Sequence, residues 1–527
     1  MKDLNLKDIN LTAEEKATLL LRKLYQEKGF KKFNMARFEE YGFYASNRDF
    51  LTGDKVLTFT DLDGRLLALK PDITLSIIKY TKGSEEEKLY YVENVYREDK
   101  GSNNFTEVSQ VGLEYIGNIG APEISEVLDM AAISLELIDD EYILEVSNMD
   151  FADSILKSMG MEYEDYAHML TLIRQKNIDG IRKLGNRIGL VQEDVERVAK
   201  IPKLYGPIED VMGSARKICK EQAQEEYLNS FARVLKELKR KNSKGKVQLD
   251  FSIINDIGYY NGVIFKGYVK GMSETILSGG QYDKAMKKFG RKEGGIGFAL
   301  YLDGLGRMKE DEGPGSSGRE KEMLNIALPK GRLADEVHGM LQKSGYFCPE
   351  YSDKDRRLIF ENPEAGVRYL LVKPSDVAVY VEHNAADIGI VGKDILMENN
   401  PDVYELLDLG IGRCKMCVAA PKEYIDNQET TLQVATKYVN VAKKYYGRKN
   451  RDIEIIKLNG SIELGPILGL TDVIVDIVET GKTLKDNDLE VVEAFKDISA
   501  RVIASKHGFK FKNKEITKLV QNLRDIQ

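Results

Sequence analysis

One stretch of the chain divides it and constrains every other conclusion about the fold. Residues 309–322 read KEDEGPGSSGREKE, contain no apolar side chain and centre on a Gly-Pro-Gly-Ser-Ser-Gly run. This composition predicts an interdomain linker. An apolar strand pattern begins at residues 324–328, directly after the stretch, which argues against the alternative of a long surface loop inside one domain. With 527 residues, the chain is long enough for each half to have its own core.

Composition excludes several classes of protein. Hydrophobic residues make up 42% and charged residues 31% of the chain, which are ordinary globular values. The net charge of −8 argues against broad nucleic-acid binding, so an anionic ligand would need a local basic pocket. Four cysteines are too few for a disulfide scaffold, and no apolar run reaches the roughly 18 residues of a membrane span. The N-terminal segment lacks the continuous apolar core of an export signal, so we expect a cytoplasmic protein.

The N-terminal half, residues 1–308, predicts an antiparallel sheet with a helical insertion at about 151–244. Thr12 and Glu15 form a capping box that begins an amphipathic helix ending at Gly29. Short strand patterns separated by turn residues are typical of antiparallel hairpins. The strand patterns cover residues 56–59, 66–69, 89–95, 108–116, 247–254 and 263–269.

The C-terminal half, residues 323–527, alternates strand and helix patterns. Such alternation predicts an α/β fold with largely parallel strands. The expected strands cover residues 324–328, 369–372, 388–391, 414–420, 453–457 and 473–478.

Residues 472–484 carry the strongest chemical signal of this half. A buried strand runs directly into the turn Thr480-Gly481-Lys482-Thr483. Backbone N–H groups and two hydroxyls of such a turn can surround one phosphate. Asp476 and Glu479 precede the turn, where carboxylates could bind ribose hydroxyls next to the phosphate. From these residues alone, a plain strand-turn-helix corner with threonine caps stays an equal alternative.

Cations follow several strands of the same half. Lys330, Arg356 and Lys373 stand at or near strand ends, where open α/β sheets bind ligands. Each alone is more typical of a solvated surface cation. Together they could bind a polyanion such as a diphosphate beside a triphosphate.

Cysteine and histidine residues give weaker signals. Cys414 and Cys417 lie within a strand pattern without a second pair of ligands, which favours a core role over a zinc or redox site. His383 could be a general base, although an ordered structural imidazole is the favoured interpretation.

Residues 323–527 resemble the short-form catalytic subunit of ATP phosphoribosyltransferase, the first enzyme of histidine biosynthesis. The resemblance rests on residues 328–333 (LPKGRL), 356–360 (RRLIF), 375–394, 435–440 (ATKYVN) and 463–484. It implies a two-lobed, periplasmic-binding-protein-like α/β fold, with lobe I at about 323–413 and 497–527 and lobe II at about 414–496. It also implies attack by adenine N1 of ATP on C1 of phosphoribosyl pyrophosphate (PRPP).

The same resemblance implies roles for individual residues. Ribose hydroxyls would be bound by Glu463 and Asp476, and the 5-phosphate by Glu479, Thr480, Gly481, Lys482 and Thr483. Lys330, Arg356 and Lys373 would contact the pyrophosphate and triphosphate as the catalytic cations. Lys373 stands where other members carry Arg, so its contact need not be bidentate. Mg²⁺ would stabilise the pyrophosphate leaving group, and its protein ligands stay unknown.

Residues 1–308 resemble the catalytic core of histidyl-tRNA synthetase, and more closely its non-synthetase paralogue, the regulatory subunit of ATP phosphoribosyltransferase. The matching segments are residues 69–74 (LKPDIT), 91–98 (YVENVYRE), 110–114 (QVGLE), 257–262 (IGYYNG) and 279–283 (GGQYD). The resemblance implies a class II synthetase-like sheet and a histidine pocket. The pocket residues would be Asp72, Thr74, Arg97, Gln110, Glu114, Tyr259 and Tyr260.

Departures from the synthetase pattern favour the regulatory relative. Synthetases carry an Arg where this chain has Asn255, an Asp where it has Gly258, and an ATP-binding Arg where it has Gly304. Two cations needed for ATP chemistry are therefore missing. A scaffold that retains these residues without a ligand remains the alternative for the N-terminal half.

We expect a fusion of the regulatory and the catalytic parts: an ATP phosphoribosyltransferase that uses ATP and PRPP and that histidine inhibits through the N-terminal half. Two other functions stay open, a histidine-adenylate-forming enzyme and a non-catalytic ligand sensor. A homo-oligomer is expected, and binding to tRNA or a membrane is not.

Overall fold

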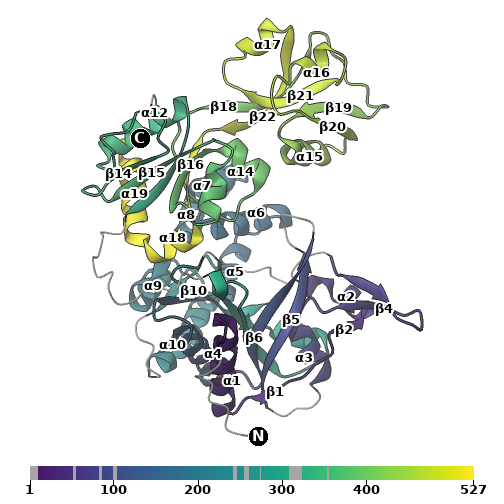
Figure 1. Cartoon of the computed structure of the whole chain (residues 1–527), viewed down its shortest axis with the longest axis vertical. Coiled ribbons are helices and arrows are strands. Elements are labelled where there is room, and N and C mark those ends of the chain that lie inside the picture. Colours follow the sequence, from purple (N-terminus) through teal and green to yellow (C-terminus); the bar gives the residue numbers. More distant parts are fainter. Residues whose placement is uncertain are drawn as a thin grey trace. The chain divides into compact units, whose positions relative to one another are not determined.

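The structure is a computed structural model that describes residues 10–51, 55–81, 86–98, 104–240, 246–254, 260–272, 274–307, 323–352 and 355–527. The chain forms two compact units, Met1–Gly313 and Pro314–Gln527, each with its own sheets (Figure 1). The division falls inside residues 309–322, which lie outside the described residues. The linker and the domain limits therefore stay predictions. No helix in the described ranges is long and apolar enough to cross a membrane.

A large sheet forms the centre of the N-terminal unit. In the part of this unit that the structure describes, nine strands pair in the order β1-β5-β6-β12-β11-β10-β7-β9-β8. Neighbours are antiparallel, except that β1 runs parallel to β5 and β7 to β9. The strands are β1 (Lys31–Lys32), β5 (Glu87–Glu98), β6 (Phe105–Gly117), β7 (Tyr142–Asn148), β8 (Tyr205–Gly206), β9 (Val247–Asp250), β10 (Asn261–Val269), β11 (Leu277–Gln281) and β12 (Gly294–Tyr301). The predicted antiparallel sheet is confirmed.

Helices α1 (Ala13–Glu27) and α4 (Ala121–Glu136) cover one side of this sheet with apolar side chains. The predicted capping box is present, because the Glu15 N–H donates to Thr12 Oγ1 at 3.2 Å and the Thr12 N–H to Glu15 Oε2 at 2.8 Å. The chain turns away after α1 at Gly29, whose φ of 85° is readily adopted by glycine.

A smaller sheet of β2 (Phe38–Glu40), β4 (Leu66–Leu69) and β3 (Thr58–Thr60) adjoins the large one. The β3–β4 hairpin turns at Gly64, with φ of 80°, as the Asp-Gly pair predicts. Helix α2 (Tyr41–Ala45) packs against β2 and β4, and α11 (Asp283–Lys288) packs against β12 of the large sheet. Helix α3 (Thr74–Tyr80) begins after the loop that follows β4, and this loop carries Asp72 of the polar cluster described below.

The helical insertion follows β7. It consists of α5 (Met149–Lys157), α6 (Tyr163–Arg174), α7 (Ile178–Arg187), α8 (Gln192–Lys200), α9 (Ile208–Arg216) and α10 (Gln222–Arg240), with β8 inside it. A buried ion pair joins the insertion to the sheet, since Lys176 Nζ lies 2.9 Å from Asp250 Oδ1 of β9. Removing either partner would leave a buried charge uncompensated, so the pair fixes this junction.

The C-terminal unit has two lobes. Lobe I contains a sheet ordered β14-β15-β13-β16-β23-β17, and lobe II one ordered β20-β19-β21-β18-β22. Lobe I comprises β13 (Leu324–Pro329), β14 (Ile359–Asn362), β15 (Val367–Val372), β16 (Ile388–Gly392), β17 (Tyr404–Asp408), β23 (Ala500–Ala504), α12 (Arg332–Lys343), α13 (Val377–Glu382), α14 (Lys393–Asn399), α18 (Lys506–Phe511) and α19 (Asn513–Ile526). Lobe II comprises β18 (Cys414–Pro421), β19 (Leu432–Thr436), β20 (Ile453–Lys457), β21 (Val473–Val478), β22 (Leu489–Ile498), α15 (Val439–Arg448), α16 (Leu464–Ile467) and α17 (Lys482–Asp486). The predicted two-lobed α/β fold is confirmed.

Parallel pairing joins the central strands of the lobe I sheet and the three strands at one edge of the lobe II sheet. Strand β13 runs parallel to β15 and β16, and β19 runs parallel to β20 and β21. The expectation of largely parallel strands is wrong for β14, β17, β18, β22 and β23, which pair antiparallel with their described neighbours. Strand β18, along which the chain enters lobe II, runs opposite to β21, and β23, along which it returns to lobe I, runs opposite to β16. Strand β22 is antiparallel to β18 and therefore runs in the same direction as β21, and β14 forms a hairpin with β15.

Candidate functional site

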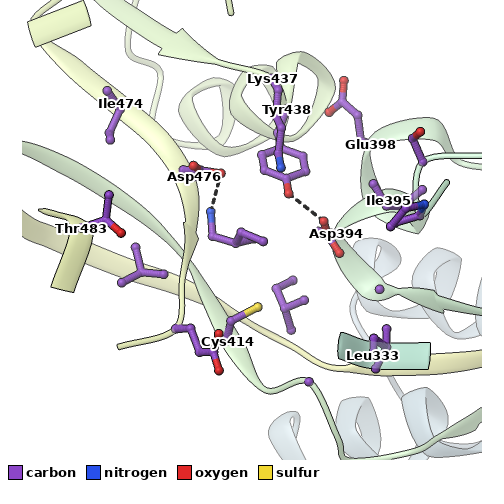
Figure 2. Close-up of a pocket in the computed structure, with 18 of the residues that line it drawn as sticks. Leu333, Asp394, Ile395, Glu398, Cys414, Lys437, Tyr438, Ile474, Asp476 and Thr483 are labelled. Carbon is purple, nitrogen blue, oxygen red and sulfur yellow. Dashed lines mark hydrogen bonds between the residues drawn. The ribbon is translucent and has the colours of Figure 1, made fainter. Parts of the chain in front are cut away.

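A cleft of about 1200 Å³ lies between the two lobes of the C-terminal unit (Figure 2). Its size suits two substrates side by side rather than one small ligand. The parallel strands β19, β20 and β21 of lobe II have their carboxyl ends at the cleft. Open α/β sheets bind ligands at this edge. Polar or charged lining residues are Glu336, Lys373, Ser375, Asp394, Glu398, Asn399, Lys437, Tyr438, Lys457, Asn459, Glu463, Asp476, Glu479, Thr480, Lys482 and Thr483.

The turn after β21 forms one wall of the cleft. All seven residues expected to bind PRPP line it: Glu463, Asp476, Glu479, Thr480, Gly481, Lys482 and Thr483. Gly481 has a φ of 70°, so the turn needs the left-handed conformation that glycine adopts freely. Helix α17 is only five residues long and contributes little dipole. Phosphate binding at this turn would depend on the N–H groups, the two threonine hydroxyls and Lys482.

Asp476 is a half-buried carboxylate in the floor of the cleft. Its Oδ1 accepts a hydrogen bond from the Ile477 N–H at 2.8 Å (Figure 2). Burial raises the pKa of Asp476, the Ile477 N–H and the Lys437 ammonium lower it, and the Glu463 and Asp394 carboxylates raise it further. An acidic cluster with one nearby cation therefore stands where a sugar's hydroxyls could be bound.

The three predicted catalytic cations lie on lobe I, and the structure brings only one of them to the cleft wall. Lys373 follows β15 and lines the cleft. Lys330 is exposed at the end of the neighbouring β13, where its N–H donates to Val372 O at 2.9 Å. Arg356 is exposed in the segment before β14. Lys330 and Arg356 are outside the lining set.

Several lining residues were missed by the sequence reasoning. Lys437 follows β19 and Lys457 ends β20, so both lie at the carboxyl end of a strand, as Lys330 and Lys373 do. The rule that open α/β sheets bind ligands at this edge could therefore have identified them from the sequence. Asp394 and Tyr438 are a buried pair across the two lobes, in which the Tyr438 hydroxyl donates to Asp394 Oδ2 at 2.6 Å.

The donors for a metal ion are limited. In the described ranges no group of three or more His, Cys, Asp or Glu side chains is arranged to hold one. Burial raises the pKa of Cys414 to about 11, which disfavours a thiolate ligand. Cys417 is buried in β18, as expected for a core residue. His383 is exposed at the end of α13 and is outside the lining set.

A second cluster lies in the N-terminal unit, on one face of the large sheet. Gln110 and Glu114 lie on the same face of β6, and Arg97 lies on β5. Asp72 comes from the loop before α3, and Thr74 is the first residue of that helix. The Thr74 hydroxyl donates to Glu114 Oε1 at 2.8 Å, and Arg97 Nε donates to Pro71 O at 3.1 Å.

The electrostatics of this cluster centre on buried carboxyl groups. Burial raises the pKa of Glu114 to about 8; the Thr74 hydrogen bond opposes this rise and the Asp72 charge adds to it. Burial also raises the pKa of Asp72, while Arg97 lowers it. The pKa of Tyr260 is raised by burial and by the Tyr301, Asp72 and Glu114 groups nearby. Asp72, Arg97, Glu114 and Tyr260 therefore lie within electrostatic reach of one another. Tyr91, Tyr282 and Tyr301 act on the same groups and were missed by sequence reasoning.

Glycines make room for this cluster. A Cβ at Gly297 would lie 1.8 Å from Glu114 Oε2, and one at Gly112 would lie 2.3 Å from the Tyr91 hydroxyl. Neither clash could be relieved without moving a buried polar side chain, so glycine is required at both positions.

Three predicted positions of the N-terminal half, Asn255, Gly258 and Tyr259, lie outside the described residues. Gly304 is described. It lies in the turn after β12, where a Cβ would stand 2.6 Å from Met272 Cε. No cation can come from this position.

The chain is similar to two protein families. Residues 2–305 match the family model described as histidyl-tRNA synthetase, and residues 373–525 match the one described as ATP phosphoribosyltransferase.

Two relatives and one solved structure agree with these matches. An ATP phosphoribosyltransferase of Brachyspira hyodysenteriae is 57% identical over 205 residues, which are 39% of this chain and 100% of that protein. Another, of Lachnoclostridium phytofermentans, is 50% identical over 208 residues, 38% of this chain and 96% of that protein. The crystal structure of an ATP phosphoribosyltransferase regulatory subunit/histidyl-tRNA synthetase from Bacillus halodurans matches with a TM-score of 0.51 and 20% identity, covering 65% of this chain and 90% of that chain. This last likeness shows the fold alone.

Proposed function

Because the chain belongs to the ATP phosphoribosyltransferase family through residues 373–525 and to the histidyl-tRNA synthetase family through residues 2–305, we propose that its interlobe cleft binds PRPP and ATP and that its N-terminal unit binds histidine as an inhibitor. The chain is an ATP phosphoribosyltransferase, a transferase of histidine biosynthesis. One observation carries the proposal: the turn at residues 480–483, here called the phosphate turn, lines the same cleft as the carboxylates of Glu463 and Asp476. The lysines of that cleft are Lys373, Lys437, Lys457 and Lys482.

PRPP binds along lobe II. Thr480, Gly481, Lys482 and Thr483 hold the 5-phosphate through N–H groups, hydroxyls and one ammonium, with Glu479 at the start of the turn. Glu463 and Asp476 accept hydrogen bonds from the ribose hydroxyls, which fixes the sugar next to the turn. Lys373 meets the pyrophosphate or triphosphate from lobe I, with Lys330 and Arg356 reaching the same phosphates from outside the described cleft wall.

The reaction is an in-line displacement at C1 of the ribose. The bond from C1 to the pyrophosphate oxygen breaks as the bond from adenine N1 to C1 forms, and the carbon passes through a state with oxocarbenium character. The carboxylates near the ribose favour the positive charge that develops on the ring, and the lysines favour the departing pyrophosphate. No covalent enzyme intermediate is required.

The residues present fit a Mg²⁺ ion that arrives with the substrate. Such an ion is commonly held by one or two carboxylates together with substrate phosphates, so a preformed cage of protein ligands is not needed. The ion would supply charge neutralisation on the pyrophosphate.

Histidine binds the cluster of the N-terminal unit. Its carboxylate is bound by Arg97. Its ammonium and imidazole groups are bound by Asp72, Thr74, Gln110, Glu114, Tyr259 and Tyr260. Histidine adenylate does not form, because Asn255 and Gly304 replace the cations that adenylation needs. We also propose that the enzyme is a cytoplasmic homo-oligomer that does not bind tRNA. A histidine-dependent exchange of pyrophosphate into ATP would instead favour the alternative of an adenylate-forming enzyme.

The phosphate turn provides the direct test. Thr480→Val removes a hydroxyl from the turn while keeping the shape of the side chain, and we expect PRPP binding measured by titration calorimetry to weaken about 3- to 15-fold, the usual effect of one lost hydrogen bond. Thr431→Val, at an exposed position before β19, is the matched control and should bind like the parent. Equal affinity in the two variants would remove the turn from the PRPP site.

A further inference from the structure

Asp476 lies among charges that oppose each other. The carboxylates facing it are Glu463, at the start of α16, and Asp394, in α14 of lobe I. The cation with the largest effect on it is Lys437, which directly follows β19, the parallel neighbour of β21, and lines the same cleft. In the described cleft, two negative charges and burial therefore oppose ionisation of Asp476, and one ammonium and the Ile477 N–H favour it.

The neighbouring groups that could titrate do not offset this balance. Tyr438 and Cys414 lie within electrostatic reach of Asp476, and Cys417 pairs with it between β18 and β21. Burial raises the pKa of all three side chains, so they stay protonated and uncharged. Lys437 is thus the one cation among the largest influences on Asp476.

The geometry keeps Lys437 and Asp394 in place. Lys437 Nζ lies 4.7 Å from the centroid of the Tyr438 ring, a distance at which a cation is attracted to the ring face. The Tyr438 hydroxyl holds the Asp394 carboxylate at 2.6 Å (Figure 2). Gly392 leaves room for that carboxylate, since a Cβ there would lie 2.2 Å from Asp394 Oδ1. Both charges therefore have fixed positions around Asp476.

Protonation of Asp476 would change what it can bind. An ionised carboxylate only accepts hydrogen bonds, and both of its oxygens can accept from neighbouring ribose hydroxyls. A protonated carboxyl has one donor and loses part of this capacity.

We propose that Lys437 is a positioning residue of the phosphoribosyl transfer: it keeps Asp476 ionised against the charges of Asp394 and Glu463, and so keeps it able to hold the ribose of PRPP. This inference rests on the proposed function, in which Asp476 binds the ribose hydroxyls. Lys437 itself needs no contact with substrate for this role.

The test compares the KM for PRPP at pH 6 and pH 8 among variants of the full chain. Lys437→Met removes the cation, so Asp476 takes up a proton more readily, and the ratio of KM at pH 6 to KM at pH 8 should rise about two- to fivefold over the parent, the range of a partly exposed charge pair. Lys437→Arg keeps the charge and should restore the parent ratio. Because the phosphates of PRPP titrate equally in every assay, only differences between variants count.

A variant that should change the KM ratio in the opposite direction strengthens the test. Asp394→Asn removes a negative charge but keeps an oxygen that accepts from Tyr438, so the ratio should fall below that of the parent. Lys457→Met is the matched control, since Lys457 lines the cleft but is not among the largest influences on the pKa of Asp476. It should leave the ratio unchanged even if it raises KM at both pH values.

The outcomes separate this inference from the proposed function. If Asp476→Asn raises the KM for PRPP while Lys437→Met keeps the parent ratio, Lys437 has no positioning role and the ribose assignment stands. If Asp476→Asn leaves the KM unchanged, the assignment of Asp476 is itself wrong. If Lys437→Arg fails to restore the ratio, the effect is not one of charge.

Discussion

Glu114 is the residue whose chemistry most directly links the N-terminal unit to a ligand. It is 2% exposed, and the Tyr282 hydroxyl lies close enough to its carboxyl group to lower its pKa. Burial raises its pKa from 4.5 to about 8, so at neutral pH the empty cluster holds it mostly protonated. A ligand cation placed beside it would favour the charged form and release the proton.

Histidine binding should therefore release up to about one proton near pH 7.5, where the imidazole of free histidine is mostly neutral. The measurement is calorimetric titration in two buffers of different ionisation enthalpy. Glu114→Gln cannot ionise and should bind histidine more weakly, with no buffer dependence. Absence of proton release in the parent, or the same release in the variant, would contradict the assignment of Glu114 to the histidine site.

At the scale of elements, α14 and α15 form a noncovalent bridge between the lobes. Helix α15 has no capping side chain of its own at its first residue. Its free N–H groups at Asn440 and Val441 donate instead to the Glu398 carboxylate of α14, at 2.9 and 3.1 Å. Glu398 thus caps a helix of the other lobe, which ties the width of the cleft to the stability of α15.

Glu398→Ala should remove this cap and lower the free energy of unfolding of the C-terminal unit by about 1 kcal/mol. For a unit of this size that corresponds to a fall in Tm of about 2–4 °C. Differential scanning calorimetry of the full chain measures it. Glu454→Ala, exposed on β20, should leave the transition unchanged. A Tm as high for Glu398→Ala as for Glu454→Ala would mean that the bridge does not stabilise the unit.

The elements that sequence reasoning found and those it missed differ in where their information lies. The capping box of α1 and the strand β4 were predicted at their positions, because local patterns define them. Strand β22 was missed: four of the ten residues in its sequence LEVVEAFKDI are charged and most positions are exposed, and its pairing with β18 makes it a strand.

The cleft residues likewise divide into those that a local motif positions and those that depend on how the two lobes pack. One continuous motif placed Thr480, Gly481 and Thr483 in the cleft wall, because a turn positions its own residues. The pairing of Asp394 with Tyr438 depends on how two lobes meet, and no local pattern contains that information.

At the scale of the whole molecule, the catalytic unit and the proposed effector unit belong to one chain. A covalent connection makes any encounter between the two units intramolecular, so even a weak contact can transmit the presence of a ligand. Histidine need favour one arrangement of the units by only about 1–3 kcal/mol to change substrate affinity 5- to 150-fold.

The central claim is that the chain transfers phosphoribose to ATP under control of histidine bound in its N-terminal unit, and one turnover assay tests it. Pyrophosphate release from ATP and PRPP is followed with rising histidine for the parent and for Glu114→Ala and Tyr260→Ala, two changes distant in sequence from the cleft residues. The account predicts turnover by all three without histidine, and a higher histidine concentration for half inhibition in both variants. Inhibition of both variants at the same concentration as the parent, or no pyrophosphate release at all, would contradict it.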